Sequence, residues 1–148
     1  MKIYFAAAVT GGRDYEDYNK DIAKILTGLG HNILSEHVVG FELQKVFRKK
    51  AEASGNFSKY ISSHNKKLMD RADVIVAECS QGSLGTGFEI CYCAYVRKIP
   101  AICLRHEKAP GKASSTIFGD SSRLIKSYFY NDKNLEEVLT KAIGKIKG

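Results

Sequence analysis

Apolar residues along the chain follow two patterns, short continuous runs and longer stretches of helical spacing. The run Val74–Glu78 is rich in β-branched residues and predicts a strand that is buried on both faces of a sheet. Within Tyr15–Leu29, the residues Ile22, Ile25 and Leu26 recur at helical spacing and predict an amphipathic helix. The same criteria predict further strands at Lys2–Val9, Asn32–Val39, Pro100–Leu104 and Ile125–Tyr130. They predict further helices at Gly40–Ala53, Phe57–Arg71, Phe88–Arg97 and Leu135–Ile146.

Strands and helices therefore alternate along the chain. This alternation predicts an α/β fold, a doubly wound, flavodoxin- or Rossmann-like parallel sheet of five strands with helices on both faces. No linker, repeat or low-complexity tract divides the sequence, so residues 1–148 are expected to form a single domain. Ligands of such sheets bind beyond the carboxyl ends of the strands. Those ends are the loops Thr10–Asp14, Cys79–Gly87 and Arg105–Gly119.

The composition is that of an ordinary globular chain, with 148 residues of which 44% are apolar and 26% charged. It excludes a disordered, collagen-like or coiled-coil protein. No apolar run approaches the roughly 18 residues that a membrane span needs. The apolar start Met1–Val9 is interpreted as the first core strand rather than as a secretory leader, because a glycine pair follows it. We therefore expect a cytoplasmic protein, or a nuclear one in a eukaryote.

The four cysteines Cys79, Cys91, Cys93 and Cys103 lie in apolar segments and match no zinc or redox spacing. We expect reduced core cysteines and no metal site. The formal charge of +7 favours an anionic partner. Basic and aromatic residues do not interleave in the manner of a nucleic-acid platform, so nucleic-acid binding is the weakest interpretation of this charge.

Two loops carry candidate chemistry. In the first, Gly11 and Gly12 allow the backbone to approach a ligand, and Arg13 is suited to bind phosphate; a plain turn is an equally good interpretation. The second, Ser80–Gly87, offers small residues, the Ser83 hydroxyl and backbone donors. It leads into a helix whose first turn is expected to hold Glu89.

Glu89 has two interpretations. A carboxylate in a first helical turn commonly complements the helix dipole. Beside a phosphate-sized loop it is also suited to attack the anomeric carbon of a sugar. His37 is expected at the end of the second strand, on the same rim, although a structural histidine is the more common role. Tyr4 on the first strand is most simply a core residue.

Taken together, these segments resemble the 2′-deoxynucleoside 5′-phosphate N-hydrolases of the nucleoside 2-deoxyribosyltransferase superfamily. The resemblance covers nearly the whole chain in order, and its most specific element is Ser83-Leu84-Gly85-Thr86-Gly87-Phe88-Glu89. The other matching segments are Ile3-Tyr4-Phe5, Gly11-Gly12-Arg13, Ser35-Glu36-His37-Val38, Ala72–Glu78, Ile102-Cys103-Leu104-Arg105 and Ser114–Gly119.

The resemblance implies hydrolysis of the N-glycosidic bond of 2′-deoxynucleoside 5′-monophosphates. Glu89 would attack C1′ of the deoxyribose with Tyr4 beside it, and no metal or organic cofactor is expected. Ser114 would complete the site of a neighbouring subunit, which implies a homodimer. The residues implied to bind the nucleotide are Ala7, Val9, Thr10, Gly11, Gly12, Arg13, His37, Ser83, Gly85 and Ser114.

The chain departs from the family pattern at two places. Asn65 stands where the family usually carries an aspartate that works with the nucleophile, and an amide cannot shuttle a proton. Asp70 lies five positions further along the helix and is not expected to replace it. In the first loop, Thr10 stands where animal relatives carry a basic residue, and Ala7-Ala8 replaces Gly-Ser. Phosphate binding there is expected to be weaker or differently arranged.

Asn65 keeps a second hypothesis open, a nucleotide-binding protein with weakened or absent catalysis. A third is base exchange by a nucleoside 2-deoxyribosyltransferase. Those enzymes act on uncharged nucleosides, which makes a phosphate loop paired with Ser83 a feature that favours the hydrolase.

Overall fold

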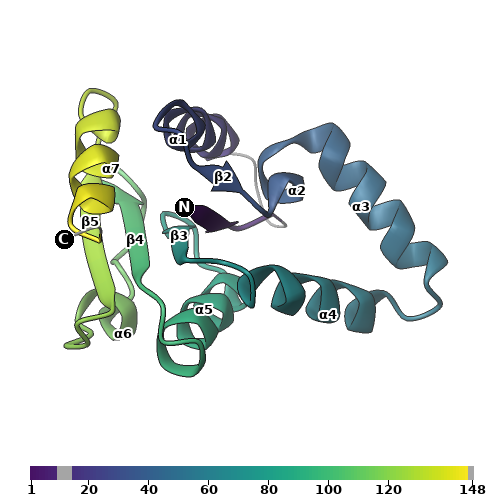
Figure 1. Ribbon diagram of the computed structural model, residues 1–148. Coiled ribbons are helices and arrows are strands. Elements are labelled where there is room, and N and C mark those ends of the chain that lie inside the picture. The colour runs from purple at the N-terminus through teal and green to yellow at the C-terminus, as the bar shows by residue number, and fades with distance from the viewer. Residues whose placement is uncertain (10–14, 147–148) are drawn as a thin grey trace.

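The computed structural model describes residues 1–9 and 15–146. In this part of the chain five parallel strands form one sheet in the order β2-β1-β3-β4-β5, shown in Figure 1. The predicted α/β class and parallel five-stranded sheet are confirmed. The strands are β1 (Lys2–Ala6), β2 (Asn32–Ile33), β3 (Val74–Glu78), β4 (Ala101–His106) and β5 (Ile125–Tyr130).

Helices cover both faces of the sheet, as the doubly wound pattern predicts. Side chains that alternate along β1 and β3 belong to two separate cores, because successive residues of a strand point to opposite faces. Ile3 and Val74 pack with α1 and α7, whereas Tyr4 and Ile75 pack with the helices that follow β3. The helices are α1 (Glu16–Gly28), α2 (Glu36–Val39), α3 (Phe41–Ala53), α4 (Phe57–Met69), α5 (Leu84–Cys91), the π-helical segment η1 (Tyr92–Val96), α6 (Ser115–Phe118) and α7 (Leu135–Gly144).

The second predicted strand is wrong over most of its length. β2 contains only Asn32 and Ile33, and the segment Glu36–Val39 is the helix α2. The Ser35 hydroxyl explains the early end of the strand, because it both donates to and accepts from the backbone of Phe5, at 2.7 Å in each case. This side chain takes over the pairing with β1 and frees the following residues to turn into a helix.

Two further differences concern the segments after β3 and β4. The helix predicted from Phe88 begins four residues earlier, at Leu84, and the loop predicted after β4 contains the short helix α6. In each case a serine accepts a hydrogen bond from a backbone N–H three residues on, Ser83 from Thr86 and Ser114 from Ile117. Serine is a strong N-cap, so both helices begin where the cap stands.

Helices α3 and α4 form an arm that runs out from the sheet and turns back on itself (Figure 1). Ala51 is the buried residue of α3 and Met69 that of α4, so the arm has little core of its own. None of the helices in the described ranges is long and apolar enough to cross a membrane. The cysteines are free; Cys93 and Cys103 are buried as expected, whereas Cys91 is exposed.

Candidate active site

Glu89 lies in the second half of α5, and the strand β1 and the helix α4 position its partners. Since α5 begins at Leu84, Glu89 stands in the second helical turn, not in the first. The helix-dipole interpretation therefore loses its basis, because the dipole acts on charges within the terminal turn. The carboxylate instead faces β1 and α4, where Tyr4 and Asn65 contact it.

Three side chains that are far apart in the sequence meet at the Glu89 carboxylate. The Tyr4 hydroxyl donates to Glu89 Oε1 at 2.7 Å, and Asn65 Nδ2 donates to the same oxygen at 3.1 Å. Tyr4 is fully buried, and so its hydroxyl is held in one place by the core around it. Oε2 accepts no hydrogen bond from the described part of the chain, which leaves one carboxylate oxygen available to a ligand.

Burial sets the electrostatics of this group. Desolvation raises the pKa of Glu89 above its ordinary value, and the hydrogen bonds from Tyr4 and Asn65 offset part of that rise. Burial likewise raises the pKa of Tyr4, and the neighbouring Glu89 charge raises it further. Tyr4 therefore remains a neutral hydrogen-bond donor, and Glu89 is a partly desolvated carboxylate, which is a stronger nucleophile than a fully hydrated one.

A pocket of about 310 Å³ opens beside Glu89, between α4 and α5. Its wall is mostly apolar, and its polar side chains are Asn65, Glu89 and the serines Ser58 and Ser62. Gly85 contributes a wall without a side chain. The full lining is Phe57, Ser58, Ile61, Ser62, Asn65, Met69, Gly85, Phe88 and Glu89.

His37 lies near this centre but not as predicted. It stands on the helix α2, and its ring packs at 4.2 Å from the Phe47 ring and 5.5 Å from the His64 ring. Burial, together with His64, lowers the pKa of His37 to about 4, and an interaction with Asn65 offsets part of this drop. Among residues 1–9 and 15–146, no group donates a hydrogen bond to Asn65 Oδ1. At neutral pH the imidazole is uncharged.

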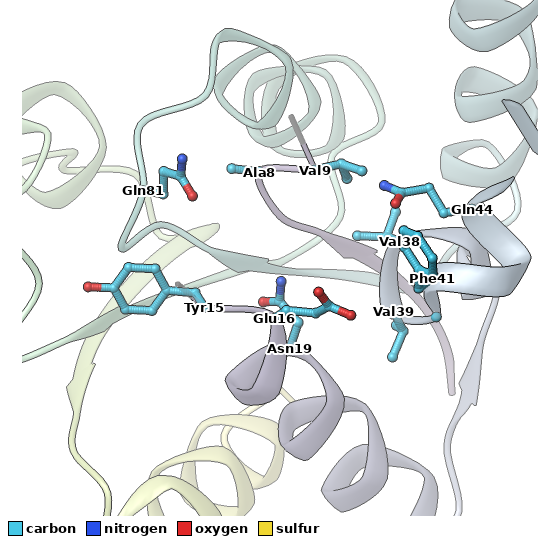
Figure 2. A pocket seen from close by; sticks show the side chains of 11 residues that line it. Ala8, Val9, Tyr15, Glu16, Asn19, Val38, Val39, Phe41, Gln44 and Gln81 are labelled. Carbon is cyan, nitrogen blue, oxygen red and sulfur yellow. The ribbon is translucent and has the colours of Figure 1, made fainter. Parts of the chain in front are cut away.

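A second, smaller pocket of about 40 Å³ lies at the carboxyl end of β1. Figure 2 shows Ala8 and Val9 on one side of it and Gln81, from the loop after β3, on another. Ala7 is buried just before it, and Val9 is exposed. The predicted residues Thr10, Gly11, Gly12 and Arg13 lie outside the described residues.

The remaining predicted residues stand at helix starts. Ser83 caps α5, and its hydroxyl proton is still free to be donated. Ser114 caps α6, is exposed and lines neither of these two pockets. Asp70, as expected, is engaged elsewhere, because it binds Tyr92 at 2.8 Å and Arg97 at 3.4 Å.

Sequence reasoning missed the apolar wall of the pocket. Phe57, Ile61 and Phe88 were not among the residues expected to form the site. The sequence did contain one signal for this wall, because Phe57 and Phe88 belong to the segments that contain Asn65 and Glu89. Within residues 1–9 and 15–146, no group of three His, Cys, Asp or Glu side chains is placed to hold a metal ion.

The sequence and the fold were compared with known proteins. The family described as nucleoside 2-deoxyribosyltransferase matches residues 3–125. A Methanosarcina mazei protein, named as a 2′-deoxynucleoside 5′-phosphate N-hydrolase, is 32% identical over 138 residues, which are 93% of this chain and 80% of that protein. The mouse 5-hydroxymethyl-dUMP N-hydrolase is 31% identical over 139 residues, 93% of this chain and 76% of the enzyme.

Solved structures agree on the fold. The 2-deoxyribosyltransferase of Bacillus psychrosaccharolyticus superposes with a TM-score of 0.64 at 13% identity, covering 99% of this chain and 96% of its own. A Clostridium botulinum CMP N-glycosidase superposes with a TM-score of 0.56 at 14% identity, covering 97% of this chain and 99% of its own. The resemblance found in the motifs is thereby confirmed, and the chain belongs to the nucleoside 2-deoxyribosyltransferase family.

Proposed function

We propose that this protein hydrolyses the N-glycosidic bond of 2′-deoxynucleoside 5′-monophosphates, releasing the free base and 2-deoxyribose 5-phosphate. The observation that carries the proposal is the Glu89 carboxylate, which is held through one oxygen by Tyr4 and Asn65 and belongs to a residue that lines a pocket. Relatives named as N-hydrolases of deoxynucleotides support it.

The chemistry takes two steps at C1′ of the sugar. Glu89 attacks C1′ and forms an ester bond, the C1′–N bond breaks, and its electron pair leaves with the base. A water molecule then attacks C1′, returns the carboxylate and gives the free sugar phosphate. The first transition state has oxocarbenium character, and the neighbouring carboxylate stabilises its positive charge. Tyr4 and Asn65 hold Oε1, so Oε2 is the attacking atom.

Protonation of the departing base is a step in which the neighbours of Glu89 do not take part. Asn65 is an amide, Tyr4 remains protonated, and His37 is uncharged at neutral pH, so none of these three neighbours acts as a general acid. The base therefore leaves as an anion or takes its proton from water. Turnover is expected to rise with the acidity of the leaving base, and a series of 5-substituted dUMP analogues compared for initial rate tests this. A rate independent of that acidity would show that an acid does reach the base.

The phosphate is proposed to lie at the start of α5. The Ser83 hydroxyl, the backbone of Gly85 and the segment Ala7–Arg13 would bind it, with His37 near the nucleotide. The charge of +7 favours a doubly charged anion as substrate. The exposed Ser114 is proposed to reach the site of a second copy, which would make the protein a homodimer.

The experiment incubates the pure protein with deoxynucleoside monophosphates, ribonucleoside monophosphates and unphosphorylated deoxynucleosides, and measures free base by chromatography. Base release is expected to be far faster from the deoxy-monophosphates than from the unphosphorylated deoxynucleosides, and none is expected from the ribonucleoside monophosphates. Faster release from unphosphorylated nucleosides would replace the monophosphate with the nucleoside as the substrate. A new nucleoside when a second base is added would replace hydrolysis with base exchange.

The amide of Asn65 favours one other candidate, a nucleotide-binding protein with little turnover. Its expected result is measurable binding of a deoxynucleoside monophosphate by calorimetry with no base released over hours.

A further inference from the structure

A buried arginine at the end of β4 joins two loops at the carboxyl edge of the sheet. Arg105 is 6% exposed, and its guanidinium donates to five backbone carbonyl oxygens. One terminal nitrogen binds the loop after β3, at 3.3 Å to Cys79 O and 3.2 Å to Ser80 O. The other binds the loop after β4, at 3.2 Å to Ala109 O, 2.9 Å to Pro110 O and 3.0 Å to Gly111 O.

The charge of Arg105 is balanced inside the protein. Glu78, which is 1% exposed, lies close enough for Arg105 to lower its pKa against the rise caused by burial. The Ser80 hydroxyl accepts from the His106 N–H at 2.8 Å and donates to Glu78. Buried charges persist only where partners compensate them, so this arrangement holds both loop bases rigidly.

Each of the two loops leads directly to a serine. Ser83, the N-cap of α5, stands three positions after Ser80, and Ser114, the N-cap of α6, stands three positions after Gly111. We infer that Arg105 is a positioning residue for substrate phosphate: it fixes the loop that carries Ser83 for this chain's own site and the loop that carries Ser114 for the site of the second copy, without contacting the substrate itself. The inference rests on the proposed function, because it presumes that these loops bind the 5′-phosphate.

The shape of the guanidinium explains why this position needs arginine. Its planar fork places donors in two directions at once, whereas a lysine ammonium is a single point of charge. Arg105→Lys therefore keeps the positive charge near Glu78 but loses the hydrogen bonds to one of the two loops. Arg105→Met loses the hydrogen bonds to both loops.

The test measures kcat and KM for a deoxynucleoside monophosphate and for the corresponding unphosphorylated deoxynucleoside. Loss of loop spacing is expected to raise KM for the monophosphate about tenfold in Arg105→Lys while kcat changes little. The unphosphorylated nucleoside is expected to react as in the wild type, because Glu89 and its partners are untouched. Arg123→Met, which removes an exposed arginine, is the matched control and leaves all constants unchanged.

A glycine pair tests the same point without touching the buried charge. Gly111 and Gly55 both have positive φ, +73° and +78°, and both have open space where a Cβ would stand. Alanine strains either turn equally. Gly111→Ala shifts one loop bound by Arg105 and is expected to raise KM for the monophosphate, whereas Gly55→Ala in the arm is expected to leave it unchanged. The comparison of Gly111→Ala with Gly55→Ala remains decisive if the Arg105 variants fail to fold.

The outcomes separate the two proposals. A wild-type protein that releases no base, or does not prefer the monophosphate, overturns the proposed function and this inference with it. A wild type that prefers the monophosphate, with Arg105→Lys and Gly111→Ala both retaining that preference, overturns the role of Arg105 alone. An equal loss of kcat/KM for both substrates would assign Arg105 a purely structural role, and this result would also overturn the inference.

Discussion

Burial acts on the two glutamates Glu78 and Glu89, and their surroundings differ in one decisive respect. Glu78 and Glu89 each have a pKa raised by burial, and each accepts a hydrogen bond from a tyrosine. Both oxygens of Glu78 are occupied, by the Ser80 N–H at 3.1 Å each and by the hydroxyls of Ser80 and Tyr130 on Oε1. Glu89 has donors on one oxygen and a pocket beside it.

This difference teaches which buried carboxylate is available for chemistry. Burial and a perturbed pKa are common to both, so neither property identifies a nucleophile by itself. In this pair it is Glu89 that has an oxygen without a donor among the described residues and that lines a space a substrate can enter. Glu78 has Arg105 as a nearby charge and no oxygen to spare, which suits a structural anchor.

The largest expected effect comes from Glu89→Gln. Because the amide cannot form the ester, turnover is expected to fall by at least about 10⁴-fold, while the affinity for a deoxynucleoside monophosphate stays within a few-fold. Base release and calorimetric binding measure the two quantities. Unchanged turnover would remove Glu89 from the chemistry.

Glu78→Ala is expected to act on stability instead. Removing this carboxylate leaves Arg105 without its buried counter-charge and Tyr130 without its acceptor, which costs about 3 kcal/mol of unfolding free energy. Urea denaturation measures the loss, and the folded fraction is expected to retain its rate constant for base release. An intact stability combined with lost turnover would reverse the roles given to the two glutamates.

Asn65→Asp changes the site by one group. A carboxylic acid beside Glu89 can pass a proton to the departing base, so kcat is expected to rise about tenfold or more. Two carboxylates at hydrogen-bond distance share a proton, and the acid limb of the pH profile is expected to move upward. Asn56→Asp, at the N-cap of the same helix, adds the same charge as a control. No gain in kcat would favour a binding protein.

The smallest effect is expected from Tyr4→Phe. The Tyr4 hydrogen bond lowers the pKa of Glu89, so its removal raises that pKa further. Since attack needs the ionised carboxylate, kcat/KM is lost as the pH falls through this pKa, and the acid limb moves to higher pH. Tyr130→Phe removes the corresponding bond to Glu78 and should leave the limb in place. A shift of the acid limb in both variants, or in neither, would contradict the different roles given to Glu78 and Glu89.

The sheet was largely predictable because burial on both faces leaves a clear sequence pattern. Val74–Glu78 has the same bounds in sequence and structure. The strand expected at Asn32–Val39 failed because the Ser35 side chain replaced backbone pairing, which hydrophobicity does not record. In the same way, the starts of α5 and α6 depend on serine caps that apolar periodicity does not reveal.

The site was predictable only in part. Tyr4, Asn65 and Glu89 are distant in sequence, and it was the resemblance to a family that first grouped them. Their meeting at one carboxylate oxygen depends on how β1, α4 and α5 pack. The network of Glu78 and Arg105 went unnoticed, although both charges stand at the ends of apolar strands, where burial is expected and a partner is needed.

The most direct test of the central claim is to trap the ester on Glu89. The protein is incubated with a deoxynucleoside monophosphate whose sugar carries an electron-withdrawing 2′-fluorine, which slows hydrolysis of the ester, and is then digested for peptide mass spectrometry. We expect the added mass of one 2-deoxyribose 5-phosphate group, with its fluorine, on the peptide that contains Glu89, and none on that of Glu78. Base release without this adduct, or an adduct on another residue, would contradict the mechanism.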